Sequence, residues 1–483
     1  MINFHAGLQQ IEEQLLRHGL IFRSPDPQGL IAGGIQIDLN AANLRHGDGT
    51  MSEASFCDHD CTTAVGNYDC PAALSKNKGA KAKFASGEKL LEWILITREG
   101  IIEANQVFVN NGLEQYCRNM LIPPTVAAVL RATLLSKVIE VNLFGGNPEL
   151  HPEVLWLIAQ LREQGFRVNL TTTGKKIMLD AKFRDGLAQE GPHLIALSAD
   201  DVDPENTHQI LNLDPAGILA QWKQTPKNHG QAQKFLESLW TLRYAVSQYE
   251  QGKQFPPILF NMVLHKGNIR RAREIMNALQ ALSPKVMINP YPAQVSFERG
   301  IPPFDADDLE VYGKLIDYLI AEATKGNPQF TRRLHYWLVQ KAILQLHPDN
   351  PTQAARMVAG HDTWHCARTN IDFRVNKPGY VQIGRNRPTE LVQVGGVETA
   401  EPGGHLGCFW YANDITNPRQ IESAQQVTNW LLAGRSIAHE THGENCGGCV
   451  MPRLMFDMSE TEFKLDQSLV GTYLQIRQEH IGF

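Results

Sequence analysis

The middle of the chain alternates short apolar stretches with longer amphipathic ones, and this alternation constrains the fold most. Strand-like stretches occupy residues 138–144, 167–174, 193–201, 257–264 and 285–292. Helix-like stretches occupy residues 123–137, 152–165 and 268–282. Strands that alternate with helices pair in parallel, because each helix returns the chain to the same edge of the sheet. The sequence therefore predicts an α/β fold, with a partial or full barrel of parallel strands inside a layer of helices.

The rest of the chain divides around this predicted barrel. A first strand is expected where Ile35, Ile37 and Leu39 alternate with polar residues. Late in the chain, residues 370–385 place two alternating runs around a Lys-Pro-Gly turn, which is typical of a hairpin. We predict a helical segment at 1–32, the barrel at 33–300 with an insertion at about 71–121, a helical linker region at 301–361, and an α+β extension at 362–483.

Composition and charge narrow the possible surroundings of the protein. The formal net charge of -6 gives no general attraction to nucleic acid or to acidic membranes. The first residues lack the basic region, apolar core and cleavage site of a secretion signal, so we expect a cytoplasmic protein. We expect no membrane span, because no stretch approaches the roughly 18 uncharged apolar residues that one needs.

Eight cysteines are the main candidates for chemistry. In a reducing compartment, close cysteine spacings indicate metal ligation or catalysis. Cys57, Cys61 and Cys70 form C-x3-C-x8-C in a loop after the first predicted strand. Three thiolates leave one iron of a cubane cluster without a protein ligand, and that open position lets a small molecule bind the metal. Cys117 stands alone in the sequence. Three roles are open for it: a fourth ligand, a radical-quenching thiol, or a small buried side chain.

This early motif resembles the radical S-adenosylmethionine (SAM) superfamily. The usual spacing there is C-x3-C-x2-C, so this chain keeps the first interval and lengthens the second. The resemblance implies a 4Fe-4S cluster held by Cys57, Cys61 and Cys70, with SAM on the open iron. It also implies an external electron donor such as a flavodoxin or ferredoxin.

A second element of the resemblance spans residues 141–174, which are similar to the second strand, helix and third strand of the superfamily. Gly145, Gly146, Asn147 and Pro148 stand where most members have Gly-Gly-Glu-Pro. The glycines allow the backbone to approach a ligand closely. In most members the acid accepts from the ammonium group of SAM. An amide oxygen at Asn147 can accept the same hydrogen bond without charge assistance, and weaker SAM binding is one consequence.

Polar residues at later strand ends complete the implied SAM site. Barrels place ligands at the carboxyl ends of their parallel strands. Thr172, Ser198, Asp200 and Asn261 match positions that contact the cofactor in relatives. Each of these residue types is also common as an ordinary strand-end cap. The resemblance covers about residues 33–295.

The late cysteines predict a second metal centre. Cys366, Cys408, Cys446 and Cys449 combine one C-x2-C pair with two distant partners. Four thiolates satisfy a tetrahedral zinc or every iron of a cubane. The cysteine that leads into the predicted hairpin resembles the SPASM or twitch extensions of radical SAM enzymes, which implies a second, auxiliary 4Fe-4S cluster. Structural zinc is the alternative.

The resemblance also suggests a substrate. Relatives with an auxiliary cluster mostly modify ribosomally made precursor peptides, and the cysteine spacing looks most like the nif11-class maturases, which include spliceases that excise a tyrosine-derived unit from the backbone. No leader-binding domain precedes the predicted barrel, so we expect a small partner protein to present the peptide. Two alternatives remain open: a radical SAM dehydrogenase or mutase acting on a small molecule, and a zinc-stabilised binding protein without enzymatic activity.

Overall fold

The computed structural model describes the centre of the chain almost continuously and its two ends in pieces. The longer described ranges are residues 34–39, 41–45, 51–55, 86–114, 139–144, 147–199, 212–226, 230–292, 304–325 and 423–432. Shorter pieces lie between 128 and 137, at 337 and 341, and at 365–366, 372–376, 392–393, 404–406, 419–420 and 454–455. The predicted N-terminal helical segment, residues 1–32, lies outside them.

A nine-stranded sheet organises the described residues, in the order β13-β12-β10-β1-β4-β5-β6-β7-β8. Seven neighbouring strands are parallel: β10 (Asp372–Asn376), β1 (Gly34–Asp38), β4 (Glu140–Phe144), β5 (Arg167–Thr172), β6 (Leu194–Ala199), β7 (Ile258–Leu264) and β8 (Val286–Pro292). Two antiparallel strands, β12 (Gly404–Leu406) and β13 (Arg419–Gln420), extend one edge. The prediction of an α/β fold with a parallel sheet is confirmed.

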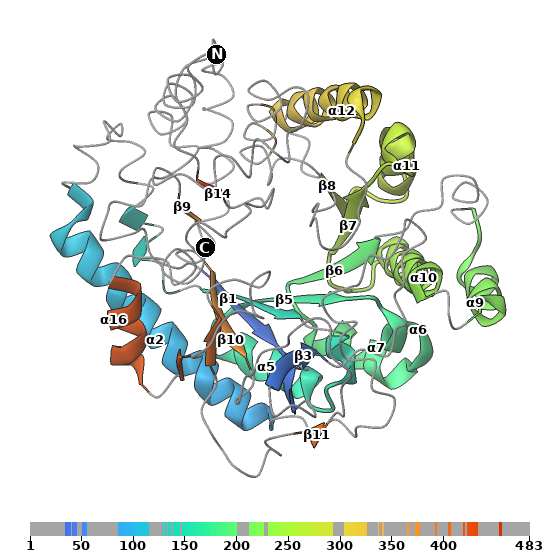
Figure 1. The fold of residues 1–483 in the computed structure, drawn as a ribbon. Coiled ribbons are helices and arrows are strands. Elements are labelled where there is room, and N and C mark those ends of the chain that lie inside the picture. The colour runs from blue at the N-terminus through green and yellow to red at the C-terminus, as the bar shows by residue number, and fades with distance from the viewer. Residues whose placement is uncertain are drawn as a thin grey trace, which may run out of the picture.

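Helices cover the outer side of this curved sheet (Figure 1). They are α2 (Gly87–Asn111), α5 (Val154–Glu163), α6 (Lys175–Leu179), α7 (Ala181–Glu190), α9 (Pro215–Gln224), α10 (Gly230–Glu250), α11 (Ala272–Gln280), α12 (Ala306–Thr324) and α16 (Ala424–Leu432), with short turns η2 (Pro148–Leu150) and η3 (Ile269–Arg271). Helix α5 ends before Gly165, whose φ of 80° suits glycine. Among the described strands, β8 and β13 form the two edges of the sheet, and they do not pair with each other. Closure of the sheet into a barrel therefore stays a prediction.

Two small sheets flank the main one. The hairpin of β2 (Ala41–Arg45) and β3 (Met51–Ser55) pairs with β11 (Val392–Gln393). The other sheet joins β9 (His365–Cys366) to β14 (Leu454–Met455), with Cys366 opposite Leu454. No helix in the described part of the chain is long and apolar enough to cross a membrane.

Helix α2 occupies residues whose pattern suggests only an insertion. Its buried positions recur at helical spacing: Gly87, Leu90, Trp93, Ile94, Thr97, Gly100, Ile101, Ala104, Asn105, Phe108 and Val109. Ser86 caps its first turn by accepting from the backbone N–H of Lys89 at 3.2 Å. Polar Thr97 and Asn105 interrupt the apolar stripe, which explains why the periodicity is weak in the sequence. Thr97 is satisfied inside the helix by donating to the Trp93 carbonyl at 2.7 Å.

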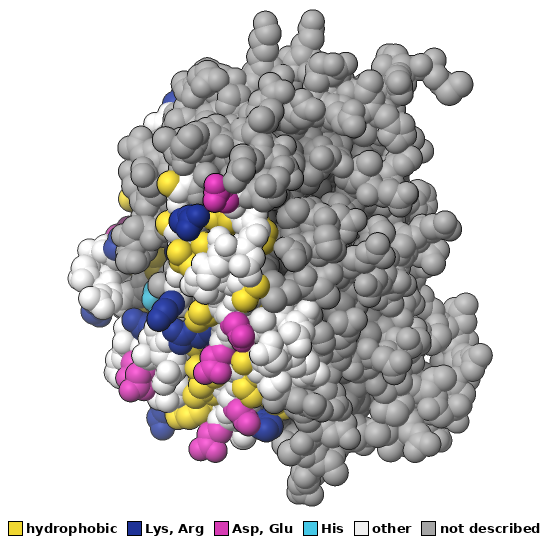
Figure 2. All heavy atoms as spheres, turned by 90° about the vertical axis from the view of Figure 1, so that its left-hand side faces the viewer, with side chains coloured by type: hydrophobic (Ala, Val, Ile, Leu, Met, Phe, Trp, Pro, Cys, Tyr) yellow, Lys and Arg dark blue, Asp and Glu magenta, His cyan; other side chains and the backbone are white. Residues whose placement is uncertain are grey.

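The C-terminal part packs directly onto this framework. Strand β10 pairs with β1, and helix α16 lies along α2 (Figure 1). The Thr428 hydroxyl on α16 lies 3.2 Å from the Gly100 carbonyl and 3.0 Å from a carboxylate oxygen of Glu103. Only the first arm of the predicted 370–385 hairpin lies within the described residues, as β10. On the side of α2 and α16, described basic and acidic side chains are mixed with apolar ones (Figure 2).

Candidate functional site

The two faces of the parallel sheet differ in chemistry. Alternate residues point to one side, and those that point toward the helices are buried and apolar, among them Val141, Leu143, Leu170, Leu197 and Phe260. The opposite face carries amides and hydroxyls among apolar residues such as Leu194, Ala196 and Leu259. The polar members are Asn142, Asn169, Thr171, Ser198, Asn261 and Asn289. We call these six residues the polar face. The interior of a packed parallel barrel is filled by branched apolar side chains, so this face is not built as a packing core.

Hydrogen bonds link neighbours on the polar face. Thr171 Oγ1 donates to Asn142 Oδ1 at 2.9 Å, and Asn289 Nδ2 donates to Asn261 Oδ1 at 2.7 Å. Ser198, Asn261 and Asn289 are register partners across β6, β7 and β8. Their side chains therefore form one row across three strands.

A second cluster lies where β4 and β5 end. Asn147 follows β4 and is 1% exposed, and its Oδ1 accepts from Thr172 Oγ1 at 3.3 Å. The Thr172 hydroxyl in turn accepts from the backbone N–H of Gly174 at 3.1 Å. The Thr172 hydroxyl has a single proton, and it donates that proton to Asn147. Thr172 therefore orients Asn147 and fixes the turn after β5.

A buried acid braces the same turn. Glu149 is fully buried, and its Oε2 accepts from the backbone N–H of Lys176 at 2.6 Å, in the first turn of α6. Lys176 Nζ donates to the Glu149 carbonyl at 3.2 Å. The loop after β4 is thereby attached to the loop after β5, so the position of Asn147 depends on both strands.

Helix α10 fixes the ends of β5 and β6 from behind. Ser238 Oγ lies 3.0 Å from the Thr173 carbonyl and 2.7 Å from the Ser198 carbonyl. Thr241 Oγ1 donates to the Gly174 carbonyl at 3.3 Å. Gly174 has a φ of 89°, and a Cβ there would lie 2.2 Å from Thr241 Oγ1. The close approach of helix and strand end thus requires glycine at this position.

The described residues contain only part of the predicted site. Asn147, Pro148 and Thr172 lie together at the ends of β4 and β5, while Ser198 and Asn261 lie on the polar face. Gly145, Gly146 and Asp200 lie outside the described residues, as do the predicted cysteine ligands Cys57, Cys61, Cys70, Cys408, Cys446 and Cys449, and Cys117. Cys366 is described only as backbone, in β9. Within the part that the structure describes, no three His, Cys, Asp or Glu side chains could hold a metal ion.

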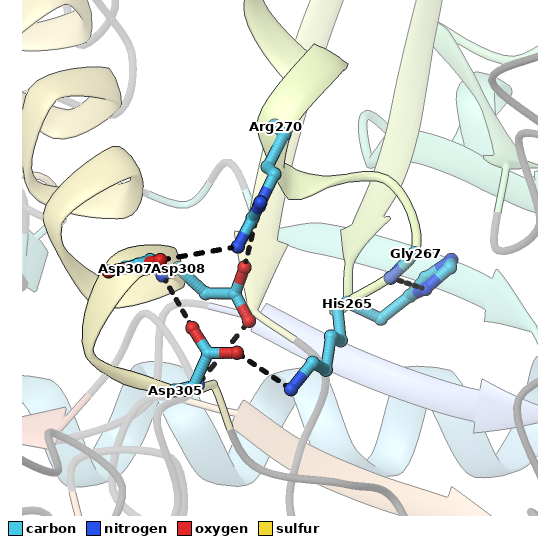
Figure 3. Close-up of polar contacts among 7 residues, drawn as sticks. His265, Gly267, Arg270, Asp305, Asp307 and Asp308 are labelled. Carbon is cyan, nitrogen blue, oxygen red and sulfur yellow. Dashed lines mark hydrogen bonds and ion pairs between the residues drawn. The ribbon is translucent and has the colours of Figure 1, made fainter.

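Ion pairs join the loop after β7 to the start of α12 (Figure 3). Lys266 Nζ lies 2.7 Å from Asp305 Oδ2, and Arg270 Nε lies 3.2 Å from the buried Asp308. Asp305 and Asp308 form a capping box, each accepting from the backbone N–H of the other. The hydrogen bond from Lys266 lowers the pKa of Asp305 to about 2.

We expect Asp305→Ala to lower the melting temperature, because it removes the α12 cap together with the Lys266 partner. The matched variant Asp307→Ala should leave the melting temperature near that of the wild type. Asp307 is exposed, and its ion pair with Arg270 is long, at 3.8 Å, so it contributes little to stability. The pKa of Asp305 is lower in the folded state than in the unfolded state. Its contribution to folding stability is therefore complete above the unfolded-state pKa and is lost as the pH falls toward 2. Thermal melts of both variants between neutral and acidic pH measure this; equal melting temperatures at neutral pH would contradict it.

Several site residues could have been found in the sequence. Asn142, Asn169 and Asn289 each lie between two apolar neighbours within a predicted strand. A parallel strand buried on both faces reads as a continuous apolar run, so an asparagine in such a strand indicates a polar face. Ser238 and Thr241 lie in a segment for which no helix was predicted, and nothing local marks them.

Comparisons with known proteins return structures only: no family model and no curated protein matches the chain. It is similar to a crystal structure of archaeal TYW1, with 17% identity over 50% of this chain and 66% of that one, and a TM-score of 0.27. It is also similar to a structure of TYW1 with a lysine-pyruvate adduct bound, with 15% identity over 53% of this chain and 70% of that one, and a TM-score of 0.29. The third structure is the crystal structure of Streptococcus suis SuiB bound to precursor peptide SuiA. The identity is 11% over 91% of this chain and 73% of that one, and the TM-score is 0.40. The chain thus spans just under two thirds of the archaeal TYW1 structure.

Proposed function

We propose that this chain is a radical SAM enzyme that modifies a ribosomally synthesised peptide. The observation that supports this most is the polar face, because amides and hydroxyls that share one side of a parallel sheet can line a ligand site. The C-x3-C-x8-C motif between β3 and α2 adds the thiolates that such a cofactor needs. When bound, the cluster and SAM supply a 5'-deoxyadenosyl radical that removes a hydrogen atom from the substrate.

The chain's own residues position these groups. Cys57, Cys61 and Cys70 are the proposed ligands of the first cluster, and Cys366, Cys408, Cys446 and Cys449 those of an auxiliary cluster. The loop of Gly145, Gly146, Asn147 and Pro148 would hold the amino end of SAM, with Thr172, Ser198, Asp200 and Asn261 as further contacts. Buried acceptor oxygens at Asn169 and Asn289 fit a polar occupant of this face. The apolar layer behind the sheet keeps water from that side of the site.

We expect Asn147→Asp to tighten SAM binding about fivefold, since a carboxylate accepts from an ammonium group with charge assistance worth ~1 kcal/mol. Thr172→Val is the companion variant. It keeps the β-branched shape but removes the proton that orients residue 147, so it should weaken binding. Equilibrium dialysis with labelled SAM measures both. If Asn147→Asp binds SAM no better than the wild type, residue 147 does not contact the ammonium group.

The finer proposal concerns the reaction. We propose backbone excision of a tyrosine-derived unit, with a small partner protein presenting the leader of the precursor and a flavodoxin or ferredoxin supplying electrons. Incubation with SAM, a reductant and a peptide encoded beside this gene tests it by mass spectrometry. Loss of a tyrosine-derived mass supports excision. A mass change confined to small metabolites favours the alternative of a dehydrogenase or mutase.

Anaerobic reconstitution tests both proposed clusters at once. Iron and sulfide counting with Mössbauer spectroscopy should show two cubane clusters for each chain. A colourless, zinc-loaded protein that does not cleave SAM would instead indicate a zinc-stabilised binding protein. Iron in the first cluster with zinc in the C-terminal part would remove only the auxiliary cluster from the proposal.

A further inference from the structure

Two carboxamides on neighbouring strands form a pair with a defined direction. Asn261 on β7 and Asn289 on β8 are register partners, and Asn289 Nδ2 donates to Asn261 Oδ1 at 2.7 Å. A carboxamide has an acceptor oxygen on one side and a nitrogen with two donor hydrogens on the other. The Asn261 oxygen is therefore turned toward β8, and its nitrogen is turned away from β8. The direction of this one hydrogen bond decides what Asn261 offers to a ligand.

The two remaining ends of the pair differ in exposure. Asn261 is partly exposed, and within the residues that the structure describes no acceptor takes a hydrogen from its Nδ2. Asn289 is 5% exposed, and its buried Oδ1 has no donor in that same set of residues. The donor end of the pair is thus open to a ligand, whereas the acceptor end is buried.

The buried acceptor of Asn289 has a cost that an apolar side chain would avoid. Burial of an amide oxygen without a donor is unfavourable. The neighbouring residues on this side of β7 and β8 are Leu259, Val263 and Met287, so an apolar residue would suit position 289. What the asparagine adds is the hydrogen bond to Asn261, which the apolar surroundings strengthen. The role of Asn289 therefore lies in how it holds Asn261.

We propose that Asn289 is a positioning residue that holds Asn261 as a hydrogen-bond donor to SAM. This inference rests on the proposed function for the identity of the ligand and for its contact with Asn261. The group that Asn261 meets must be an acceptor, which in SAM is an oxygen of the ribose or of the carboxylate. Ser198 lies on the other side of Asn261 from Asn289 in the same row, so the donor end faces the part of the row that the proposed cofactor contacts share.

Asn289→Asp tests the direction of the pair, because it keeps the shape and changes the donor. An ionised carboxylate only accepts, so Asn261 must turn and donate its own N–H to it, which leaves the Asn261 oxygen for the ligand. A protonated carboxyl group donates again and restores the original direction. Burial raises the pKa of the introduced carboxyl above its ordinary value of about 3.9. The nearest described neighbours on this face, Ser198, Leu259 and Met287, have no group that titrates between pH 5.5 and 8.

Equilibrium dialysis of SAM into the full-length reconstituted protein, without reductant, measures the effect at pH 5.5 and pH 8. Relative to the wild type at the same pH, Asn289→Asp should bind SAM about fivefold more weakly at pH 8 and regain wild-type affinity at pH 5.5, since one neutral hydrogen bond is worth about two- to tenfold in affinity. Asn289→Leu should bind more weakly at both pH values. Asn277→Asp is the matched control: it adds the same charge on the exposed side of α11, still accepts from Tyr318, and should bind like the wild type throughout.

A second probe, 5'-methylthioadenosine, keeps the ribose of SAM and lacks the carboxylate. The same pH-dependent loss with this probe assigns the acceptor to the ribose, and a loss with SAM alone assigns it to the carboxylate. Thermal melts in the same buffers show that each variant is folded, and the recovery of Asn289→Asp at pH 5.5 is a change that a purely structural role would not produce.

Wild-type affinity of Asn289→Asp at pH 8 would overturn the proposal, because it is the result expected if Asn261 were the donor within the pair. Wild-type affinity of Asn289→Leu, or no recovery of Asn289→Asp at pH 5.5, would overturn it as well. If SAM binds with the expected dependence but is never cleaved when reductant is added, the proposed enzymatic function fails and the positioning role stands. If SAM is cleaved normally and both variants of Asn289 bind it like the wild type, the positioning role fails and the enzymatic function stands.

Discussion

Cys61→Ala is expected to abolish formation of 5'-deoxyadenosine from SAM, to the level of a reaction without protein. Cys61 is the middle member of the proposed ligand trio, and two remaining thiolates would leave two irons of a cubane without protein ligands. The reconstituted variant should lose roughly half of its iron, because the proposed auxiliary cluster does not depend on Cys61. Anaerobic assay of 5'-deoxyadenosine by chromatography, beside iron counting, measures both effects.

Cys117→Ala is the matched control, since Cys117 is outside both proposed ligand sets. It should retain the iron content and the SAM cleavage of the wild type. Wild-type rates in Cys61→Ala would show that the early cysteines do not hold the reactive cluster. Loss of iron in Cys117→Ala but not in Cys61→Ala would identify a different ligand set, with Cys117 as a member.

The parallel sheet could be predicted because its strands are short and clearly bounded. Val141 and Leu143 in β4, and Leu170 in β5, fill one face, and a helix with a glycine stop separates the two strands. The first strand could be predicted in the same way. Ile35 and Ile37 are buried, as the alternation of apolar and polar residues predicts. Local pattern was enough for these strands and for the helix that separates β4 from β5.

Elements that depend on distant contacts could not be predicted in this way. Strand β10 enters the sheet beside β1 although more than three hundred residues separate them, and no local pattern encodes that pairing. Helix α2 was missed because Thr97 and Asn105 interrupt its apolar stripe, and their burial is explained only by the packing around them. Similarly, Asn147 was predicted as a site residue from its loop, but its hydrogen bond to Thr172 depends on how β4 and β5 align.

The most sensitive point of the site is Gly174, where strand β5 turns into α6. We expect Gly174→Ala to destabilise the folded state by about 2–6 kcal/mol. A non-glycine residue at positive φ costs about 1–3 kcal/mol, and overpacking adds about 1–3 kcal/mol. The added Cβ would lie 2.2 Å from Thr241 Oγ1 and 3.2 Å from the Glu237 carbonyl, so α10 or the strand end must move. Chemical denaturation measures the loss.

Gly165→Ala separates the two causes. Gly165 has a similar φ of 80°, but an added Cβ there meets no atom within 4 Å. It should therefore show only the backbone cost, about 1–3 kcal/mol. The difference between the variants then measures the close approach of α10 to β5, the contact that positions Thr172 and through it Asn147. Equal destabilisation would mean that α10 yields without cost, and the strand end could not then be held rigidly enough to orient a ligand.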